Sequence, residues 1–180
     1  MLSAVVHIVA NAFWLMLPAY IANSAAALFG GIFGKTPIDM RKNLGNKRIL
    51  GEGKTYEGFF SGVFAGLLVG MLQEFIAPLL KMPEFTPAVL LCLSAGALLG
   101  DISASFLKRR LGLRRGHPFP LLDQLDFVAG AWLLLVLCES EWFFENFTMP
   151  VAVSVLLMTP PLHLLTNFLG FKLHLKREAW

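Results

Sequence analysis

Charged residues are scarce in this chain of 180 residues, and cysteine is almost absent. Only 15% of the residues are charged, 56% are hydrophobic, and the mean hydropathy is +0.65. This composition excludes a disordered chain and does not fit a water-soluble globular domain. The two cysteines, Cys92 and Cys138, lie in apolar runs without the spacing of a zinc site or a disulfide framework, so we expect both in the core. The composition therefore predicts an integral membrane protein.

Long apolar runs divide the chain into five segments, each long enough to cross a bilayer as a helix. They cover about residues 4–22, 59–80, 87–107, 127–144 and 149–171. We therefore expect an all-α, polytopic membrane protein with five transmembrane helices, formed as a single transmembrane domain over residues 1–180. Since no long polar segment remains for a soluble catalytic domain, any active site must be built from helix ends and loops.

The basic residues predict how these helices are oriented. All but one of the 15 lysines and arginines fall in the loops at about 23–58 and 108–126 or in the last residues, which include Lys172, Lys176 and Arg177. Only Lys81 falls on the opposite side. Because positive charge accumulates in cytoplasmic loops, we expect the N-terminus outside and the C-terminus in the cytoplasm. The expected location is the cell membrane, with the active site at the cytoplasmic side.

Three aspartates lie among these basic residues, where a carboxylate at membrane depth needs a stabilising partner. Asp101 lies in the third expected helix, and Ser105 and Lys108 follow it at helical spacing on one face. Asp123 and Asp126 are three residues apart at the entry to the fourth helix. Paired carboxylates suit Mg²⁺, which combines one or two of them with water and substrate phosphate. The alternatives are a structural charge pair for Asp101 and a helix N-cap for Asp123.

The first cytoplasmic loop contains part of a phosphate-binding motif, Gly51-Glu52-Gly53-Lys54-Thr55. The complete nucleoside triphosphatase motif needs a glycine where this chain has Arg48, so that motif is rejected. Lys54 and Thr55 remain candidates for contacts with phosphate at the head of the second helix. The alternative is an ordinary turn before a helix.

The positions of the other isolated polar residues indicate which of them could contact substrate. Asn23, at the inner end of the first expected helix, either caps the helix or faces the site. His117 lies between the basic residues and Asp123, and it is a candidate contact for phosphate or base. His163 and His174 are isolated, and we expect them to be packed or solvated.

Several motifs together carry a family resemblance. The run Gly100-Asp101-x-x-x-Ser105-x-x-Lys108-Arg109, then Gly112, then Asp123-x-x-Asp126, resembles the signature of the phosphatidate cytidylyltransferase superfamily. Flanking motifs are similar to those of the CDP-archaeol synthase family: Pro18-Ala19-Tyr20-x-Ala22-Asn23, Pro37-Ile38-Asp39, Leu50-Gly51-x-Gly53-Lys54-Thr55 and Pro161-Leu162-His163-Leu164-Leu165-Thr166-Asn167. The chain departs from the wider superfamily at Gln124, where arginine is usual, and in a shorter loop, Gly116-His117-Pro118-Phe119-Pro120.

The resemblance implies a nucleotidyltransferase of archaeal ether phospholipid biosynthesis. Such an enzyme transfers a cytidylyl group from CTP to unsaturated archaetidic acid, a glycerol phosphate with two ether-linked geranylgeranyl chains, and releases CDP-archaeol and diphosphate. The implied partners are CTP, this isoprenoid ether lipid and the bilayer, without nucleic acid. The sequence leaves the oligomeric state open.

The resemblance also implies roles for individual residues. Mg²⁺ would be held by Asp101 and Asp123, with Asp126 as a third or outer ligand. Lys108 would join these three as a catalytic residue, steadying the triphosphate together with Arg109. The remaining implied contacts with CTP or the lipid phosphate are Asn23, Asp39, Lys54, Thr55, Ser105 and His117.

Three other functions are weighed against this one. A small transporter or channel would use Asp101, Asp123 and Asp126 as a relay for cations or protons, but no acidic residue lies between the cytoplasmic helix ends and the outer loops. A cytidylyltransferase acting on ester-linked phosphatidate would share the same motifs. A CDP-alcohol phosphotransferase is not favoured, because its Asp-Gly-x-x-Ala-Arg run is absent.

Overall fold

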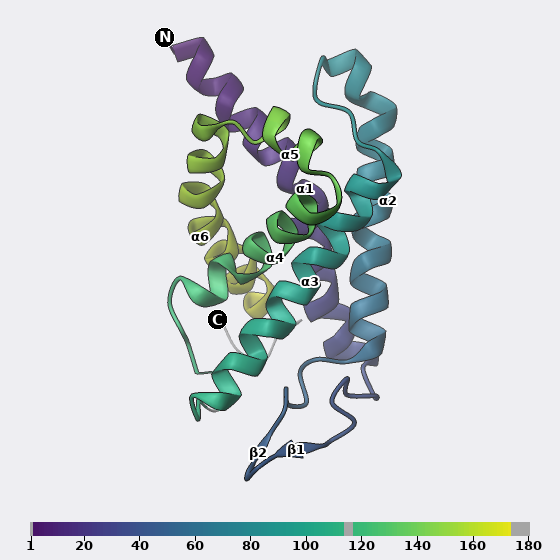
Figure 1. Ribbon diagram of the computed structural model, residues 1–180, viewed down its shortest axis with the longest axis vertical. Helices are drawn as coiled ribbons and strands as arrows, with labels where there is room; N and C mark the ends of the chain where they lie inside the picture. Colours follow the sequence, from purple (N-terminus) through teal and green to yellow (C-terminus); the bar gives the residue numbers. More distant parts are fainter. Residues whose placement is uncertain (1, 114–116, 174–180) are drawn as a thin grey trace.

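Figure 1 shows a computed structural model of the chain, which describes residues 2–113 and 117–173. The helices in this part are α1 (Leu2–Phe33), α2 (Tyr56–Leu80), α3 (Pro87–Arg110), α4 (Leu122–Cys138), α5 (Ser140–Asn146) and α6 (Met149–Lys172). A small antiparallel hairpin of β1 (Asn43–Leu44) and β2 (Lys47–Arg48) interrupts the loop between α1 and α2. The expectation of a mostly helical membrane protein is confirmed. The expected basic residues Arg114, Arg115, Lys176 and Arg177, and also His174, lie outside the described residues.

Four helices, α1, α2, α3 and α6, are long and apolar enough to cross a membrane. The remaining expected crossing, the fourth along the chain, corresponds to α4, which has 17 residues. The helix begins at Leu122, so Asp123 and Asp126 lie at its entry as expected, but the expected segment 127–144 is wrong at its end, because the chain leaves the helix at Glu139 (φ −139°, ψ 49°) before α5 begins. By length and composition, four helices can therefore cross the membrane, and whether α4 also crosses has to be argued from its exposed surface.

The first helix is longer than expected, because α1 continues to Phe33 instead of ending near residue 22. The segment after residue 23 contains Ala25, Ala26 and Ala27, and alanine has the highest helix propensity of any residue. Asn23 consequently lies inside α1 and is half-buried, so the expectation that it might cap the helix is wrong.

Glycines bring the long helices into close contact. Gly58, Gly62, Gly66 and Gly70 recur every fourth residue along α2, and all four are buried. A Cβ atom at Gly66 would lie 2.8 Å from the carbonyl oxygen of Pro18 on α1, closer than packed atoms allow. Such a small-residue face allows two helix backbones to approach each other within a membrane. The α1–α2 pair and the α3–α4 pair are the most extensive helix contacts in the described structure.

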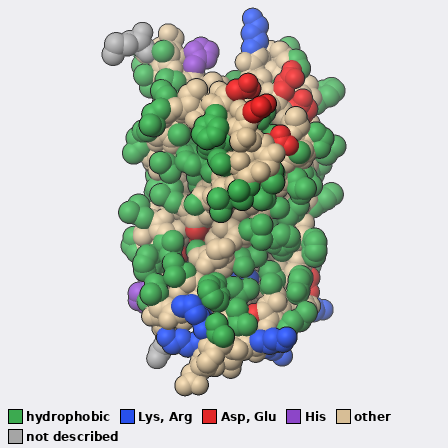
Figure 2. All heavy atoms as spheres, viewed as in Figure 1, with side chains coloured by type: hydrophobic (Ala, Val, Ile, Leu, Met, Phe, Trp, Pro, Cys, Tyr) green, Lys and Arg blue, Asp and Glu red, His purple; other side chains and the backbone are tan. Residues whose placement is uncertain are grey.

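The surface is polarised along the long axis of the bundle. Figure 2 shows a broad band of hydrophobic side chains, with acidic groups gathered at one end and basic groups at the other. Large apolar side chains such as Phe64 (68% exposed) and Phe75 (87% exposed) point outward from α2. Exposed apolar groups in such number fit a surface that faces lipid rather than water. Cys92 is buried as expected, but Cys138 is exposed, so the expectation of two core cysteines is wrong for the second.

Candidate active site

The basic end of the bundle brings together three segments that are distant in the sequence. These are the end of α3, the start of α4, and the loop between α1 and α2 that carries the β1–β2 hairpin (Figure 1). The helices α3 and α4 cross closely here, and the absence of a side chain at Gly100 allows this approach. A Cβ atom at Gly100 would collide with the carbonyl oxygen of Asp126. This crossing places Asp126 on α4 against the turn of α3 that carries Asp101.

Two lysines hold two of the expected metal ligands. Lys54 Nζ lies 2.5 Å from Asp101 Oδ2, and Lys108 Nζ lies 2.7 Å from Asp123 Oδ1. All four side chains are partly screened from solvent, with exposed fractions between 15% and 27%. The charge pair weighed as the alternative for Asp101 is thus present, and its partner is the lysine expected to contact phosphate.

The alternative for Asp123, a helix N-cap, is wrong. The N-cap position of α4 is Leu121, and no side chain caps this end by a hydrogen bond. Asp123 lies in the first turn, and its Oδ2 accepts a hydrogen bond of 2.9 Å from the backbone N–H of Phe119. The carboxylate of Asp123 therefore joins the loop before α4 to Lys108 on α3.

Asp126 is the third aspartate of the site. Its Oδ1 accepts a hydrogen bond of 2.6 Å from the backbone N–H of Phe127, and it takes part in none of the four ion pairs found in the described residues. Asp126 therefore differs from Asp101 and Asp123, each of which is paired with a lysine.

The three aspartates share one site without forming a closed set of ligands. Over residues 2–113 and 117–173, no group of three His, Cys, Asp or Glu side chains is placed to hold a metal ion. The donors are nevertheless all carboxylate oxygens, the ligand type that Mg²⁺ prefers. Each lysine ammonium balances a carboxylate charge that a divalent ion could balance instead.

The polar stripe expected on α3 is present. Ser105 is half-buried one turn after Asp101, and Lys108 and Arg109 lie in the last turn. Arg109 donates a hydrogen bond of 2.7 Å from Nη1 to the carbonyl oxygen of Leu113, so its guanidinium is next to the chain that leaves α3. The end of α3 thus presents a hydroxyl and two cations beside the aspartates.

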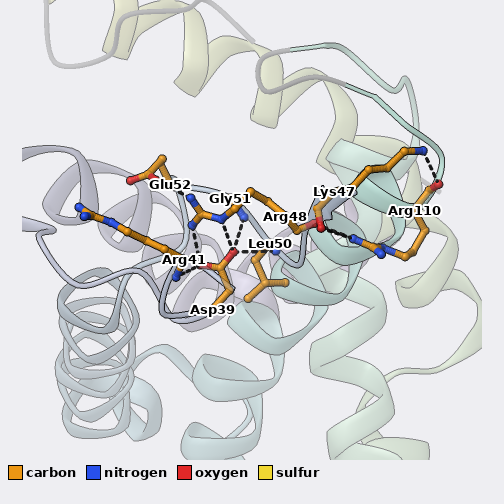
Figure 3. A network of polar contacts seen from close by, with 8 residues as sticks. All are labelled: Asp39, Arg41, Lys47, Arg48, Leu50, Gly51, Glu52 and Arg110. Carbon is orange, nitrogen blue, oxygen red and sulfur yellow. Dashed lines mark hydrogen bonds and ion pairs between the residues drawn. The ribbon is translucent and has the colours of Figure 1, made fainter. Parts of the chain in front are cut away.

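Asp39 organises the loop between α1 and α2 (Figure 3). Its side chain is fully buried and receives hydrogen bonds from the Arg48 guanidinium and from the backbone N–H groups of Arg41, Leu50 and Gly51. Burial by itself raises the pKa of Asp39, but these hydrogen bonds outweigh burial and hold the pKa well below its usual range. In this structure the carboxylate, expected to contact substrate, is engaged within its own loop.

The other expected contacts lie around this centre. Thr55 is the N-cap of α2, where its Oγ1 accepts a hydrogen bond of 3.2 Å from the backbone N–H of Gly58. Thr55 therefore has the structural role of the alternative, an ordinary turn before a helix. His117 is exposed, with Nδ1 at 3.0 Å from the carbonyl oxygen of Pro118.

A small pocket next to Asp123 is lined partly by residues that were not expected at the site. Its lining consists of Pro118, Phe119, Pro120, Asp123, Gln124, His163, Leu164 and Asn167. His163 on α6 is not isolated, because its ring stacks on Phe127 at 6.1 Å between centroids. The helical spacing of His163 and Asn167 places both on one face, and this was the signal in the sequence that could have indicated them.

Comparison with known proteins identifies the family. Residues 5–180 match the family described as CarS-like, CDP-archaeol synthase. The chain belongs to the CDP-archaeol synthase family. It is 49% identical to the CDP-archaeol synthase of Methanosarcina acetivorans over 178 residues, which cover 92% of this chain and 100% of that relative. It is 45% identical to the CDP-archaeol synthase of Halobacterium salinarum over 175 residues, covering 94% of this chain and 95% of the relative.

A solved structure of this family's kind supports the fold as well. The structure is described as an intramembrane enzyme for archaeal membrane lipids biosynthesis, and it is 40% identical to this chain. The match covers 87% of this chain and 92% of the solved one, with a TM-score of 0.69. The resemblance to CDP-archaeol synthases is therefore confirmed, and the chain is a membrane enzyme rather than a transporter.

Proposed function

We propose that this chain transfers the cytidylyl group of CTP to unsaturated archaetidic acid, giving CDP-archaeol and diphosphate. The observation that carries the proposal is the meeting of Asp101, Asp123 and Asp126 with Lys54 and Lys108 at one end of an apolar bundle. Membership of the CDP-archaeol synthase family supplies the reaction. Two anionic substrates, one soluble and one anchored in the bilayer, match a basic site at the end of membrane helices.

The reaction needs alignment and charge neutralisation more than a reactive side chain. An oxygen of the lipid phosphate attacks the α-phosphorus of CTP in line, a new phosphoanhydride bond forms, and the bond to the β-phosphate breaks to release diphosphate. Lys54 and Lys108 are positioned to exchange their carboxylate partners for phosphate oxygens when CTP arrives. Arg109 and Ser105 would extend this contact along the end of α3.

The residues present fit Mg²⁺, because the aspartates offer hard oxygen donors. Their present partners, Lys54 and Lys108, can pair with substrate phosphates instead and so release the carboxylates for the metal ion. Asp101 and Asp123 would hold the ion, with Asp126 as a third ligand or hydrogen-bonded behind it. Bound there, Mg²⁺ would neutralise charge that develops on the phosphates. The chain's own contribution is to keep the three carboxylates together through the close crossing of α3 and α4.

The site is proposed to face the cytoplasm, from which CTP is supplied. The basic residues of the first loop and of the α3 end favour this orientation. We further propose that α4 is a fifth crossing, which places the N-terminus outside. Its Leu133 (63% exposed) and Leu137 (71% exposed) point outward as on the longer helices. The lipid substrate would enter sideways, with its chains along these apolar faces.

The proposal is tested by supplying candidate substrates to the purified protein in lipid vesicles with Mg²⁺. CTP with the unsaturated ether lipid phosphate is expected to give CDP-lipid and diphosphate in equal amounts, whereas ATP gives none. Reaction with only an ester-linked phosphatidate would retain cytidylyl transfer and overturn the ether-lipid assignment. No product from folded protein with either lipid would overturn the proposed function.

A further inference from the structure

Arg110, the last residue of α3, fastens the β1–β2 hairpin to the helix. Its guanidinium donates hydrogen bonds to three backbone carbonyl oxygens of the hairpin, those of Leu44 (2.8 Å), Lys47 (3.4 Å) and Arg48 (2.6 Å). Lys47 returns a contact, since its Nζ donates to the carbonyl oxygen of Arg110 at 3.3 Å (Figure 3). The hairpin is therefore held to the end of α3 by side chains of both partners.

The contact requires the shape of arginine and not only its charge. A planar guanidinium with several N–H donors can reach carbonyl groups that point from different parts of a hairpin, whereas a lysine ammonium is a single point of charge. Arg110 also lies over the ring of Phe106, with its Cζ 5.4 Å from the ring centroid, which orients the guanidinium.

The hairpin is also linked to the loop residues that precede Lys54. Arg48, whose carbonyl oxygen Arg110 holds, pairs its own guanidinium with the buried carboxylate of Asp39 at 2.6 Å. The same carboxylate accepts hydrogen bonds from the backbone N–H groups of Leu50 (3.0 Å) and Gly51 (2.9 Å). A continuous set of short contacts therefore connects Arg110 to the chain just before Lys54.

Lys54, at the other end of the segment that begins at the hairpin, contacts α3 through its ion pair with Asp101. Asp101 and Arg110 lie on the same helix, about 13 Å apart along its axis at about 1.5 Å per residue. The segment from Leu44 to Lys54 is thus attached to α3 at two points, one at each end. Within its own loop the segment is held by Asp39 and by the hydrogen bond from the Ile38 N–H to the Lys54 carbonyl oxygen (2.8 Å). Release of the Arg110 guanidinium would leave only Lys47 and Lys54, among the described polar contacts, to fix this loop against α3.

We infer that Arg110 is a positioning residue for Lys54. It touches neither substrate, and it acts by fixing the hairpin so that the ammonium of Lys54 lies at the site where the triphosphate binds. The inference rests on the proposed function, because Lys54 is useful there only if a phosphate-bearing substrate binds. It assigns a role to a residue outside the aspartate and lysine cluster.

The test is a double-mutant cycle on the purified enzyme. Arg110→Ala and Lys54→Ala are each expected to raise the KM for CTP roughly five- to tenfold with a smaller change in kcat, and the double variant is expected to raise it no further than Lys54→Ala alone. Arg110→Lys is expected to resemble Arg110→Ala, because it keeps the charge and loses the planar group. Lys42→Ala, which removes a cation from the same loop, is the matched control and should leave the KM nearly unchanged.

Independent effects of the two substitutions, or an unchanged KM in both Arg110 variants, would overturn the inference. A spin label attached through Asn46→Cys, in a background of Cys92→Ala and Cys138→Ala, reports docking without reference to activity. Its mobility should increase in Arg110→Lys, and an unchanged mobility would also count against the inference. Absence of CDP-lipid formation by the wild type would refute the proposed function instead, and the label would still report whether Arg110 docks the hairpin.

Discussion

At the scale of single residues, Asp101 carries the most demanding role. Its carboxylate lies at the crossing of α3 and α4 and pairs with Lys54, so it is both a structural partner and a proposed metal ligand. Because Asp101→Asn keeps the size of the side chain but removes the charge, we expect it to lower cytidylyl transfer by roughly a thousandfold or more while the protein stays folded. Activity in vesicles, with elution volume and unfolding temperature as controls, measures this. An active variant would remove Asp101 from the metal site.

Asp39 gives a prediction about pH. Its pKa is lowered in the folded protein, so the unfolded chain takes up a proton first as the pH falls. The stability contributed by Asp39 is therefore fully present above the unfolded carboxyl pKa of about 3.9 and is lost progressively below it. The unfolding temperatures of wild type and Asp39→Asn should differ most near neutral pH, and the difference should begin to shrink as the pH falls below about 4. A difference that is constant across this range would contradict the assigned interactions.

At the candidate site, the residues that gather could be predicted from the sequence better than the pairs they form. Asp101, Lys108, Asp123 and Asp126 stand at helical spacings that can be read from a linear chain, and they do gather at one end of the bundle. The pairing of Lys54 with Asp101 joins residues from a loop and a helix, and only the folded chain determines it. His163 was missed for the same reason, since its neighbours come from α4.

At the scale of elements, the α3–α4 crossing depends on Gly100. A methyl group there would collide with the backbone of Asp126, so the two helices would have to move apart. We expect Gly100→Ala to destabilise the protein by about 1–3 kcal/mol and to reduce activity strongly, because it separates Asp101 from Asp126. Thermal unfolding and activity in detergent provide the measurement.

The matched control is Gly31→Ala on α1, where an added Cβ atom would have no neighbour within 4 Å. This change should be neutral or slightly stabilising, because it removes a flexible residue from a helix. Equal effects of the two substitutions would show that the crossing does not depend on close contact at Gly100.

Helix positions were largely predictable from the apolar runs, while several ends were not. The expected third and last segments agree with α3 and α6 to within a few residues. The first helix runs beyond its apolar run because Ala25–Ala27 continues to favour a helix, although Asn23 and Ser24 interrupt the hydrophobicity. The small hairpin has no hydrophobic alternation, so its docking by Arg110 could not be expected from the sequence.

At the scale of the whole molecule, the number of crossings determines which groups face the same side. The helix α4 is about 25 Å long at about 1.5 Å per residue, against a hydrocarbon layer of about 30 Å, so a modest local thinning would allow it to cross. Single cysteines introduced by Ser3→Cys, Asn46→Cys and Glu141→Cys into the cysteine-free background test this with a membrane-impermeant maleimide. We expect labelling of positions 3 and 141 in intact cells, and of position 46 only after permeabilisation. Protection of position 141 in intact cells, with position 3 labelled, would mean that α4 does not cross.

Cytidylyl transfer by the basic end of this bundle is the central claim, and the fate of the α-phosphorus of CTP tests it most directly. Purified protein in vesicles would be given unsaturated archaetidic acid, Mg²⁺ and CTP with radioactive phosphorus at either the α or the γ position. We expect label from the α position to enter the lipid, label from the γ position to appear only in diphosphate, and both to cease in Asp101→Asn. Label from the γ position in the lipid, or none from the α position with folded wild-type protein, would contradict it.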